Sequence, residues 1–140
     1  MKRYLLDSNA VTSLINHREL FVDRVRAARL QGGRIGTCEP VVAELFYGLE
    51  LSASRDLNLI RLRRALSRLA CWPLDRRASE QFGLLAAELR RRGRPMQVVD
   101  MMLAAIALSL GDCTVITTDS DLLAVPGLAV ENWELPENLS

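Results

Sequence analysis

The chain has 140 residues, of which 49% are hydrophobic and 25% are charged, and this length and composition are typical of one soluble domain covering residues 1–140. No apolar run approaches the roughly 18 residues that a membrane helix needs, and no leader segment precedes the first predicted strand, so we expect a cytoplasmic protein without membrane contact. A net charge of +1 does not by itself indicate a protein that binds nucleic acid.

The first third of the chain is predicted to alternate strands and helices. A short buried strand is expected at residues 4–6, and Asp7 after it is a natural cap for a helix that begins near Ala10. Helical spacing over residues 20–30 ends at a pair of glycines, and a second strand is expected at residues 34–38.

The middle of the chain is predicted to be mainly helical. Pro40 suits the first turn of a helix, and the apolar run over residues 41–49 indicates a helix that is mostly buried. Asp56 can cap a further helix over residues 57–70, whose leucines recur at helical spacing. A brief strand at residues 71–74 follows.

The last third of the chain completes an α/β pattern. Asp75 leads into an amphipathic helix that ends at Gly93, and a nearly all-apolar helix follows at residues 98–110. A clear strand is expected at residues 114–117 and an edge strand at residues 128–130. Strands separated by helices predict a central parallel sheet of four or five short strands, with helices on both faces.

Cysteine and histidine usage excludes several kinds of site. Cys38, Cys71 and Cys113 are odd in number and set among apolar neighbours, which predicts reduced, buried thiols. A zinc site is excluded, because there is no Cys-x-x-Cys pair and His17 is the only histidine. We expect His17 at the surface, so a serine or cysteine hydrolase would lack its base.

Several acids are placed where their carboxylates can meet. Asp7 and Asp119 follow strands, and ligands bind at the carboxyl ends of the strands in a parallel sheet. Glu44 and Asp100 stand in apolar helical segments, where an unpaired carboxylate is costly to bury. Alone, Asp7 could be a cap, Glu44 a partner of an arginine, and Asp100 an acid satisfied by helix-terminal amides. Asp119 or Asp121 alone could belong to a turn.

Together, these carboxylates would repel one another unless a cation neutralised them. An all-oxygen set favours Mg²⁺ or Mn²⁺, and Ser8, Asn9 and Thr118 offer neutral oxygens around it. Such ions can activate water and stabilise the leaving oxygen of a phosphodiester, which is nuclease chemistry. Hydrolases that form an aspartyl phosphate also carry an acid after the first strand, but they need a lysine nearby, and Lys2 is the only one.

Four motifs, taken in order, resemble those of PIN domains, and specifically of the VapC-type toxins of bacterial toxin-antitoxin pairs. They are LLDSN at residues 5–9, VAELFYG at residues 42–48, DMMLAAIA at residues 100–107 and ITTDSDL at residues 116–122. Each motif is weak alone, but their order and spacing over nearly the whole chain are specific.

The resemblance implies a three-layer α/β/α sandwich with a catalytic set that also holds the metal. That set is Asp7, Glu44, Asp100 and Asp119. Asp121 is implied either as a supporting residue beside the ligands or as an alternative ligand, and Ser8, Asn9 and Thr118 match polar positions that line the same pocket. Leu122 departs from the phenylalanine of many relatives, which concerns packing beneath the site and leaves the ligands unchanged.

The resemblance also implies a substrate and partners. Cleavage of an RNA phosphodiester by activated water would leave a 5′-phosphate and a 3′-hydroxyl. A homodimer is implied, together with a small antitoxin whose C-terminal segment covers the active site. Arginines within residues 61–68 and 90–94 could follow an RNA backbone or simply be solvated. Two alternatives stay open: a PIN nuclease of RNA processing without an antitoxin, and a non-catalytic module that binds RNA or protein.

Overall fold

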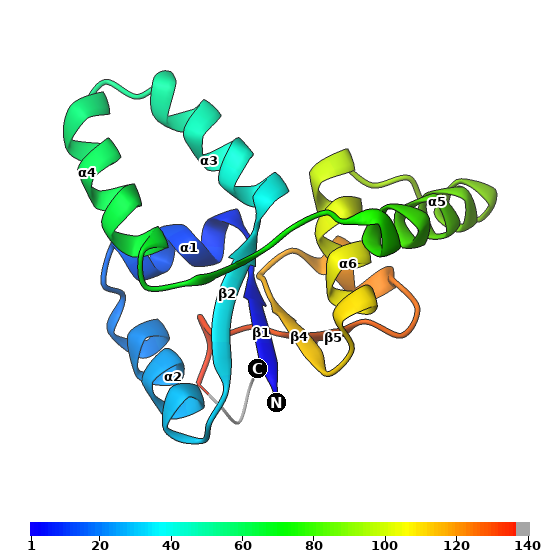
Figure 1. The fold of residues 1–140 in the computed structure, drawn as a ribbon, viewed down its shortest axis with the longest axis horizontal. Coiled ribbons are helices and arrows are strands. Elements are labelled where there is room, and N and C mark those ends of the chain that lie inside the picture. The colour runs from blue at the N-terminus through cyan, green and yellow to red at the C-terminus, as the bar shows by residue number, and fades with distance from the viewer. Residues whose placement is uncertain (137–140) are drawn as a thin grey trace.

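The centre of the computed structural model, which describes residues 1–136, is a parallel sheet of five strands in the order β3-β2-β1-β4-β5 (Figure 1). The strands are β1 Arg3–Leu6, β2 Arg34–Cys38, β3 Ala70–Trp72, β4 Cys113–Ile116 and β5 Ala129–Glu131. β1 pairs with β4 in the register that sets Leu6 opposite Ile116. The last four residues of the predicted domain lie outside the described residues.

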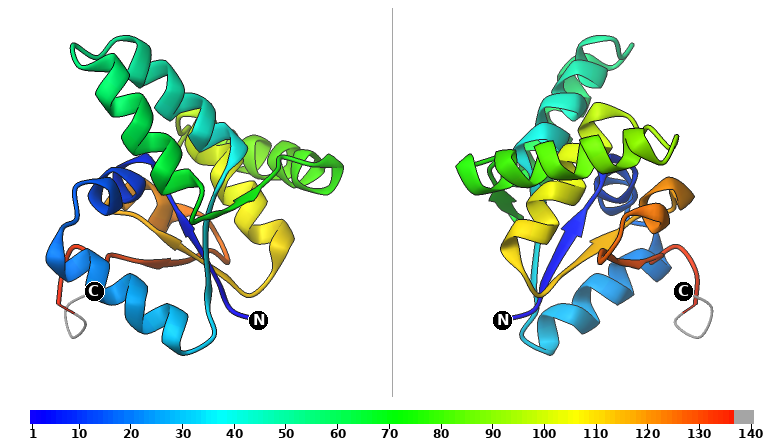
Figure 2. Two further views of the ribbon diagram at one scale, coloured as in Figure 1. Left: turned by 60° about the vertical axis from the view of Figure 1, so that its left-hand side comes forward. Right: turned by 90° about the vertical axis from the view of Figure 1, so that its right-hand side faces the viewer.

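Helices cover both faces of this sheet. They are α1 Ser8–Ile15, α2 Glu19–Leu30, α3 Glu39–Glu50, α4 Arg55–Leu66, α5 Arg76–Arg91 and α6 Val98–Leu110, with a 3₁₀ helix η1 at Ser120–Ala124. Figure 2 shows α1 and α2 on one side of the sheet and α5 and α6 on the other. The predicted three-layer α/β/α sandwich is confirmed. Across residues 1–136, no helix is long and apolar enough to cross a membrane.

The core explains why the apolar runs fold as they do. Leu5 and Leu6 of β1 and Val115 of β4 are buried between the two helical layers, which suits parallel strands covered on both faces. The sheet also constrains a glycine, because a Cβ at Gly36 of β2 would lie 2.6 Å from the carbonyl oxygen of Ala70. Only glycine lets β2 and β3 approach this closely.

α3 and α4 form a hairpin that projects beyond the carboxyl ends of the strands (Figure 1). The prediction that α3 is mostly buried is wrong: its buried residues are Val41 and Leu49, and Tyr47 is 69% exposed. α3 packs on α1, α4 and α6, and part of its apolar surface, including Tyr47, stays exposed.

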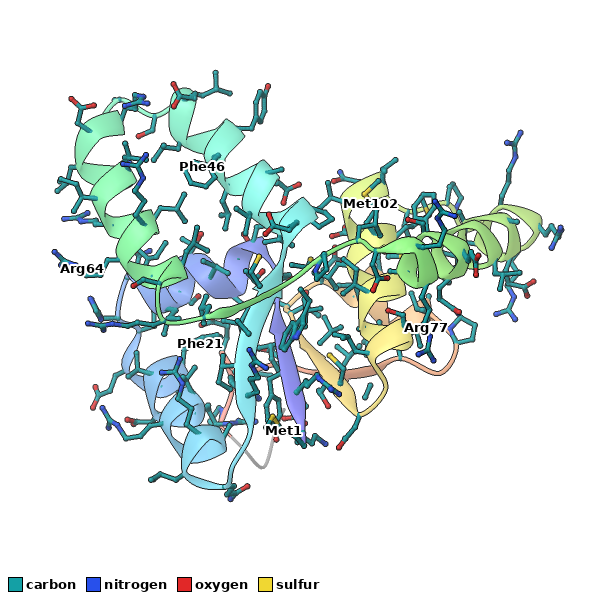
Figure 3. All side chains as sticks on the ribbon, viewed as in Figure 1. Met1, Phe21, Phe46, Arg64, Arg77 and Met102 are labelled. Carbon is teal, nitrogen blue, oxygen red and sulfur yellow. The ribbon has the colours of Figure 1, made fainter. Side chains whose placement is uncertain are left out.

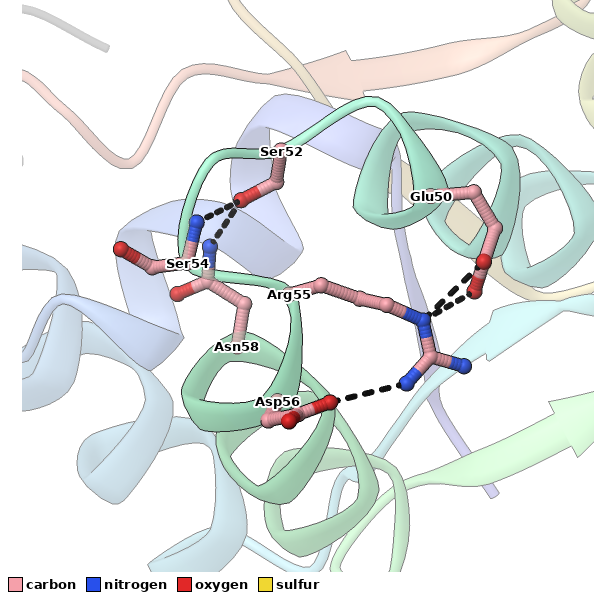
Figure 4. A network of polar contacts seen from close by, with 6 residues as sticks. All are labelled: Glu50, Ser52, Ser54, Arg55, Asp56 and Asn58. Atoms are coloured by element: carbon pink, nitrogen blue, oxygen red, sulfur yellow. Dashed lines mark hydrogen bonds and ion pairs between the residues drawn. The ribbon is translucent and has the colours of Figure 1, made fainter.

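The start of α4 also differs from the prediction. Asp56 is not the cap, because the helix begins at Arg55 after Ser54, whose side chain makes no capping hydrogen bond. Arg55 instead donates to Asp56 at 3.1 Å and to Glu50 at 3.0 Å, and the Asp56 side chain is 96% exposed (Figure 4). The helix ends at Leu66, short of the predicted residue 70, because the chain turns there to enter β3.

The three cysteines are free, as predicted, but the prediction that all three are buried is wrong. Burial raises the pKa of Cys38 to about 12, whereas Cys71 is exposed. Cys71 alternates with buried Trp72 on the edge strand β3, so its thiol points the other way and donates to Glu39 at 3.0 Å. His17 is exposed, as predicted.

Candidate active site

The predicted acids come from four elements that end or begin at one edge of the sheet. Asp7 follows β1, and Asp119 follows β4 after a two-residue connection. Glu44 stands in α3, and Asp100 stands in the first turn of α6. Because β1 and β4 are paired and parallel, the residues that follow them emerge side by side at the carboxyl edge.

Asp7 is held in place by two donors. It caps α1, since its Oδ1 accepts from the backbone N of Ala10 at 2.8 Å, and its Oδ2 accepts from the hydroxyl of Thr117. The residue is only 7% exposed. Burial raises the pKa of Asp7, these two hydrogen bonds lower it, and the charges of Asp119 and Glu44 raise it, with a net result above its ordinary value. The predicted cap is therefore confirmed, and it does not exclude a second role.

Thr117 is the residue that the sequence reasoning missed. It was expected inside a strand over residues 114–117, but β4 ends at Ile116, and Thr117 opens the loop that carries Asp119. Its hydroxyl also accepts from the backbone N of Asp119 at 2.9 Å. The available signal was a hydroxyl side chain immediately after an apolar strand and two residues before an acid.

Asp100 is half-buried and lacks a compensating partner. Among residues 1–136 its carboxylate accepts no hydrogen bond, so the alternative of helix-terminal amides is not supported. Burial, the largest cause, and nearby negative charges raise the pKa of Asp100 to about 6. From the largest effect to the smallest, those charges belong to Asp119, Glu44, Asp7 and Asp121. The negative charges of these four acids therefore act on the carboxyl of Asp100.

Glu44 is half-buried and accepts a hydrogen bond from the hydroxyl of Ser8. The alternative of a salt bridge to an arginine is not supported, because none of the ion pairs in the described residues includes Glu44. The same holds for Asp7, Asp100 and Asp119. Within residues 1–136, no basic side chain forms an ion pair with the four acids at this edge of the sheet.

The remaining polar candidates divide into two groups. Asp119 caps η1 by accepting from the backbone N of Asp121 at 2.9 Å, which matches the turn that we considered. Asp121 itself is exposed, and so are Asn9 and Thr118, which make no hydrogen bond to the acids. Ser8 is the predicted neutral residue that contacts an acid.

The donor chemistry of this edge fits a hard divalent cation. Its ligands would be carboxylate oxygens, with hydroxyls beside them and no sulfur or imidazole. In the part of the chain that the structure describes, however, no three acids, cysteines or histidines stand close enough to form a closed ligand group. A bound cation would therefore have to draw the carboxylates together.

A groove of about 690 Å³ lies between the end of α1, α2 and α4, at the opposite end of α1 from Asp7. Apolar side chains such as Leu14, Val22 and Val25 contribute to its lining. Arg64 of α4, which Figure 3 labels, is one of the residues that line it. Five arginines line the groove: Arg26, Arg29, Arg61, Arg64 and Arg68.

The sequence profile of the PIN domain family matches residues 4–128, which include every acid of the edge. This chain belongs to the PIN domain family. The resemblance expected from the four motifs is confirmed, and all four motifs lie within the matched residues.

This PIN domain is similar in sequence and in structure to VapC proteins and VapBC complexes. It is 32% identical over 133 residues to the tRNA(fMet)-specific endonuclease VapC of Shigella flexneri, covering 95% of this chain and 99% of the relative. The structure of VapBC2 from Rickettsia felis bound to a DNA fragment from its promoter matches with a TM-score of 0.87 and 26% identity, over 94% and 98% of the two chains. VapBC-5 from Mycobacterium tuberculosis, of the VapBC family of toxin-antitoxin systems, matches with a TM-score of 0.69 and 26% identity, over 94% and 98% of the two chains.

Proposed function

We propose that this PIN domain is a metal-dependent endoribonuclease and the toxin of a type II toxin-antitoxin pair, acting in the cytoplasm as one domain over residues 1–140. The observation that carries the nuclease is the set of carboxylates at the sheet edge, which have no basic partner within residues 1–136. Burial, the largest cause, and the charges of these carboxylates raise the pKa of Asp100. Carboxylates without a basic partner are expected where a bound cation compensates their negative charge. The name of the Shigella flexneri relative, an endonuclease, supports the same activity.

The catalytic set that we propose is Asp7, Glu44, Asp100 and Asp119, which would hold Mg²⁺ or Mn²⁺. A bound ion supplies activation of water and neutralisation of charge on the phosphodiester. Asp7 contributes a fixed carboxylate, because Ala10 and Thr117 hold its two oxygens. With a pKa of about 6, Asp100 carries a proton below that pH, so its carboxylate is available to the ion above it.

The polar residues around the acids take supporting roles in this proposal. Ser8 orients Glu44 through its hydroxyl. Asp121 is exposed and offers a further carboxylate beside Asp119. Asn9 and Thr118 are exposed at the same edge, where they can contact the RNA. Hydrolysis would leave a 5′-phosphate and a 3′-hydroxyl.

The antitoxin is the partner that we propose for two surfaces. Its C-terminal segment would cover the acids, and a preceding amphipathic segment with acidic side chains would lie in the groove between α1, α2 and α4. The groove joins apolar side chains to arginines, which complements such a segment in both polarity and charge. The similarity to VapBC-5, a member of a family of toxin-antitoxin systems, supports an antitoxin for this chain.

A homodimer is the assembly that we propose. The exposed apolar side chains of the α3–α4 hairpin, including Tyr47, Leu51 and Ile60, provide a surface for a second copy. The molar mass of the free chain in solution, measured by light scattering, should be twice that of the monomer and should fall in L51E. A monomeric wild-type chain would contradict this assembly.

The decisive experiment for the nuclease uses partner-free protein and a panel of structured RNAs that includes initiator transfer RNA. Incubations contain Mg²⁺, Mn²⁺ or chelator, D100N is the matched variant, and the product ends are mapped. Discrete cuts with 5′-phosphates, present only with metal and only in wild type, are the expected result. RNA bound equally well in chelator and by D100N, without cutting, would instead indicate a binding module.

Capture of the partner separates the toxin from a PIN nuclease of RNA processing. If a short gene for a candidate antitoxin adjoins the gene of this chain, co-expression of the two should yield a complex that elutes as one species and suppresses cleavage. A chain that cleaves RNA and ignores the product of that gene would contradict the toxin role and leave the nuclease intact.

A further inference from the structure

Thr117 joins three neighbouring strands at the acidic edge. Its backbone N donates to the carbonyl of Glu131 in β5 at 3.1 Å, and the backbone N of Asp7 donates to the carbonyl of Ile116 at 3.2 Å. The residue is 4% exposed. Its main chain is therefore fixed by the sheet, and the residue as a whole is almost completely removed from water.

The hydroxyl of Thr117 has a defined direction. It accepts from the backbone N of Asp119 at 2.9 Å, and an amide N can only donate. The single hydroxyl proton is then directed at Oδ2 of Asp7. Because Ala10 holds the other oxygen at 2.8 Å, each oxygen of Asp7 has one donor and keeps a lone pair for another partner.

This arrangement ties two proposed ligands to one side chain. One hydroxyl orients the carboxylate that follows β1 and fixes the start of the loop that carries the acid after β4. Turning the Asp7 side chain away would break a hydrogen bond to a charged group and leave the buried hydroxyl without an acceptor. The carboxylate is thus preorganised, whereas Asp100 has no such support.

We propose that Thr117 is a positioning residue for cation binding, which holds Asp7 in orientation and Asp119 at a fixed distance from it. The inference rests on the proposed function, because it assigns Asp7 and Asp119 to the metal. Thr117 does not itself bind the cation. Its effect is exerted through the carboxylates, so it should appear in the affinity for the metal before it appears in the rate at saturating metal.

The test measures Mn²⁺ binding by titration calorimetry on the full chain without RNA. T117V removes the hydroxyl at nearly constant volume and should weaken Mn²⁺ binding about tenfold, the loss expected for one hydrogen bond to a charged group. T117S keeps the hydroxyl and should bind within about twofold of wild type. T117A removes the hydroxyl without a second methyl group near Asp7 and replaces T117V if that variant does not fold.

Thr37 provides a matched control for lost stability. It is fully buried in β2 and donates its hydroxyl to the carbonyl of Leu6 at 2.8 Å, without contact to a carboxylate. T37V should lower the melting temperature about as much as T117V while leaving the Mn²⁺ affinity unchanged. In cleavage assays, T117V should need about tenfold more Mn²⁺ for half-maximal activity and should recover most of kcat at saturation.

The outcomes separate this inference from the proposed function. Wild type and T117V with equal Mn²⁺ affinity would overturn the positioning role while the nuclease stands, and so would an equal loss in T37V. A wild-type chain that binds no Mn²⁺ would contradict both the inference and the metal dependence of the proposed nuclease.

Discussion

Acidic side chains occupy two contrasting regions of the molecule, the edge at the carboxyl ends of the strands and the C-terminal segment, residues 129–136. In the C-terminal segment each glutamate has a basic partner: Glu134 lies 3.3 Å from Arg18, and Glu131 lies 3.6 Å from Arg24. At the edge, Asp7 and Asp100 have none among residues 1–136. A chain with 18 basic residues has cations available, so their absence from the edge indicates a site that is completed by a ligand.

Neutralising an edge acid should have the largest effect on activity. D100N and, separately, D7N are expected to lower the rate of RNA cleavage by at least about 1000-fold, because each removes a charge needed to hold the metal. Asn can still cap α1 in D7N, so circular dichroism should show an intact fold. E80Q removes an exposed acid of α5 and is the control. Cleavage by D100N at near the wild-type rate would contradict a role of the acids at this edge in the reaction.

The groove between α1, α2 and α4 shows the reverse of the acidic edge, because it contains arginines without acidic partners. Arg61 and Arg64 take part in none of the ion pairs of the described residues. R61E/R64E should weaken the complex with the antitoxin about 100-fold and leave cleavage of RNA by the free chain within about twofold, as measured by calorimetry and by RNA assay. R90E/R91E on α5 is the control. A variant that binds the antitoxin normally but needs far more RNA for half-maximal rate would assign these arginines to the substrate.

The pH dependence of stability sharpens the contrast between unpaired and paired acids. The pKa of Asp100 is raised to about 6 from 3.8, so between these values the folded state holds more protons than the unfolded state. The contribution of Asp100 to the stability of the metal-free protein is therefore full below pH 4 and is lost as the pH rises through 6. After allowance for solvent screening, D100N should be more stable than wild type by about 1 kcal/mol at pH 7. Urea unfolding at pH 4 should show no difference, and a less stable D100N at pH 7 would contradict the repulsion.

A paired acid should show the opposite sign with a smaller effect. Glu134 accepts from the hydroxyl of Ser13 and pairs with Arg18, so E134Q is expected to destabilise the chain at pH 7 by about 0.5–1 kcal/mol. E88Q breaks an exposed pair with Arg92 and should cost less, about 0.3 kcal/mol. Thermal melts of both variants measure the difference. If E134Q is more stable than wild type, the expected difference between stabilising paired acids and destabilising unpaired acids is contradicted.

Local signals in the sequence predicted the sheet well, and they singled out the acids that we propose as ligands. The apolar runs of β1 and β4 and the uninterrupted pattern of α6 are decided by composition and short-range spacing, and the helix cap at Asp7 follows from its position after β1. Glu44 and Asp100 became candidates because a carboxylate is unusual in an apolar segment, and Asp7 and Asp119 because they follow strands.

The features that were missed depend on packing between distant segments. Cys71 is exposed because it faces outward on an edge strand. The bond from Thr117 to Asp7 joins residues that are 110 positions apart. The groove requires three helices to meet. No periodicity within a single segment encodes these relations.

The long separation between Asp7 and Thr117 has a consequence for synthesis. Translation delivers Asp7, Glu44 and Asp100 first, whereas Thr117 and Asp119 follow late, and β5, which fixes the main chain of Thr117, ends at Glu131. A nascent chain or a product of premature termination therefore carries an incomplete site. For the proposed nuclease, the capacity to cleave RNA therefore arises only when nearly the whole protein has been synthesised.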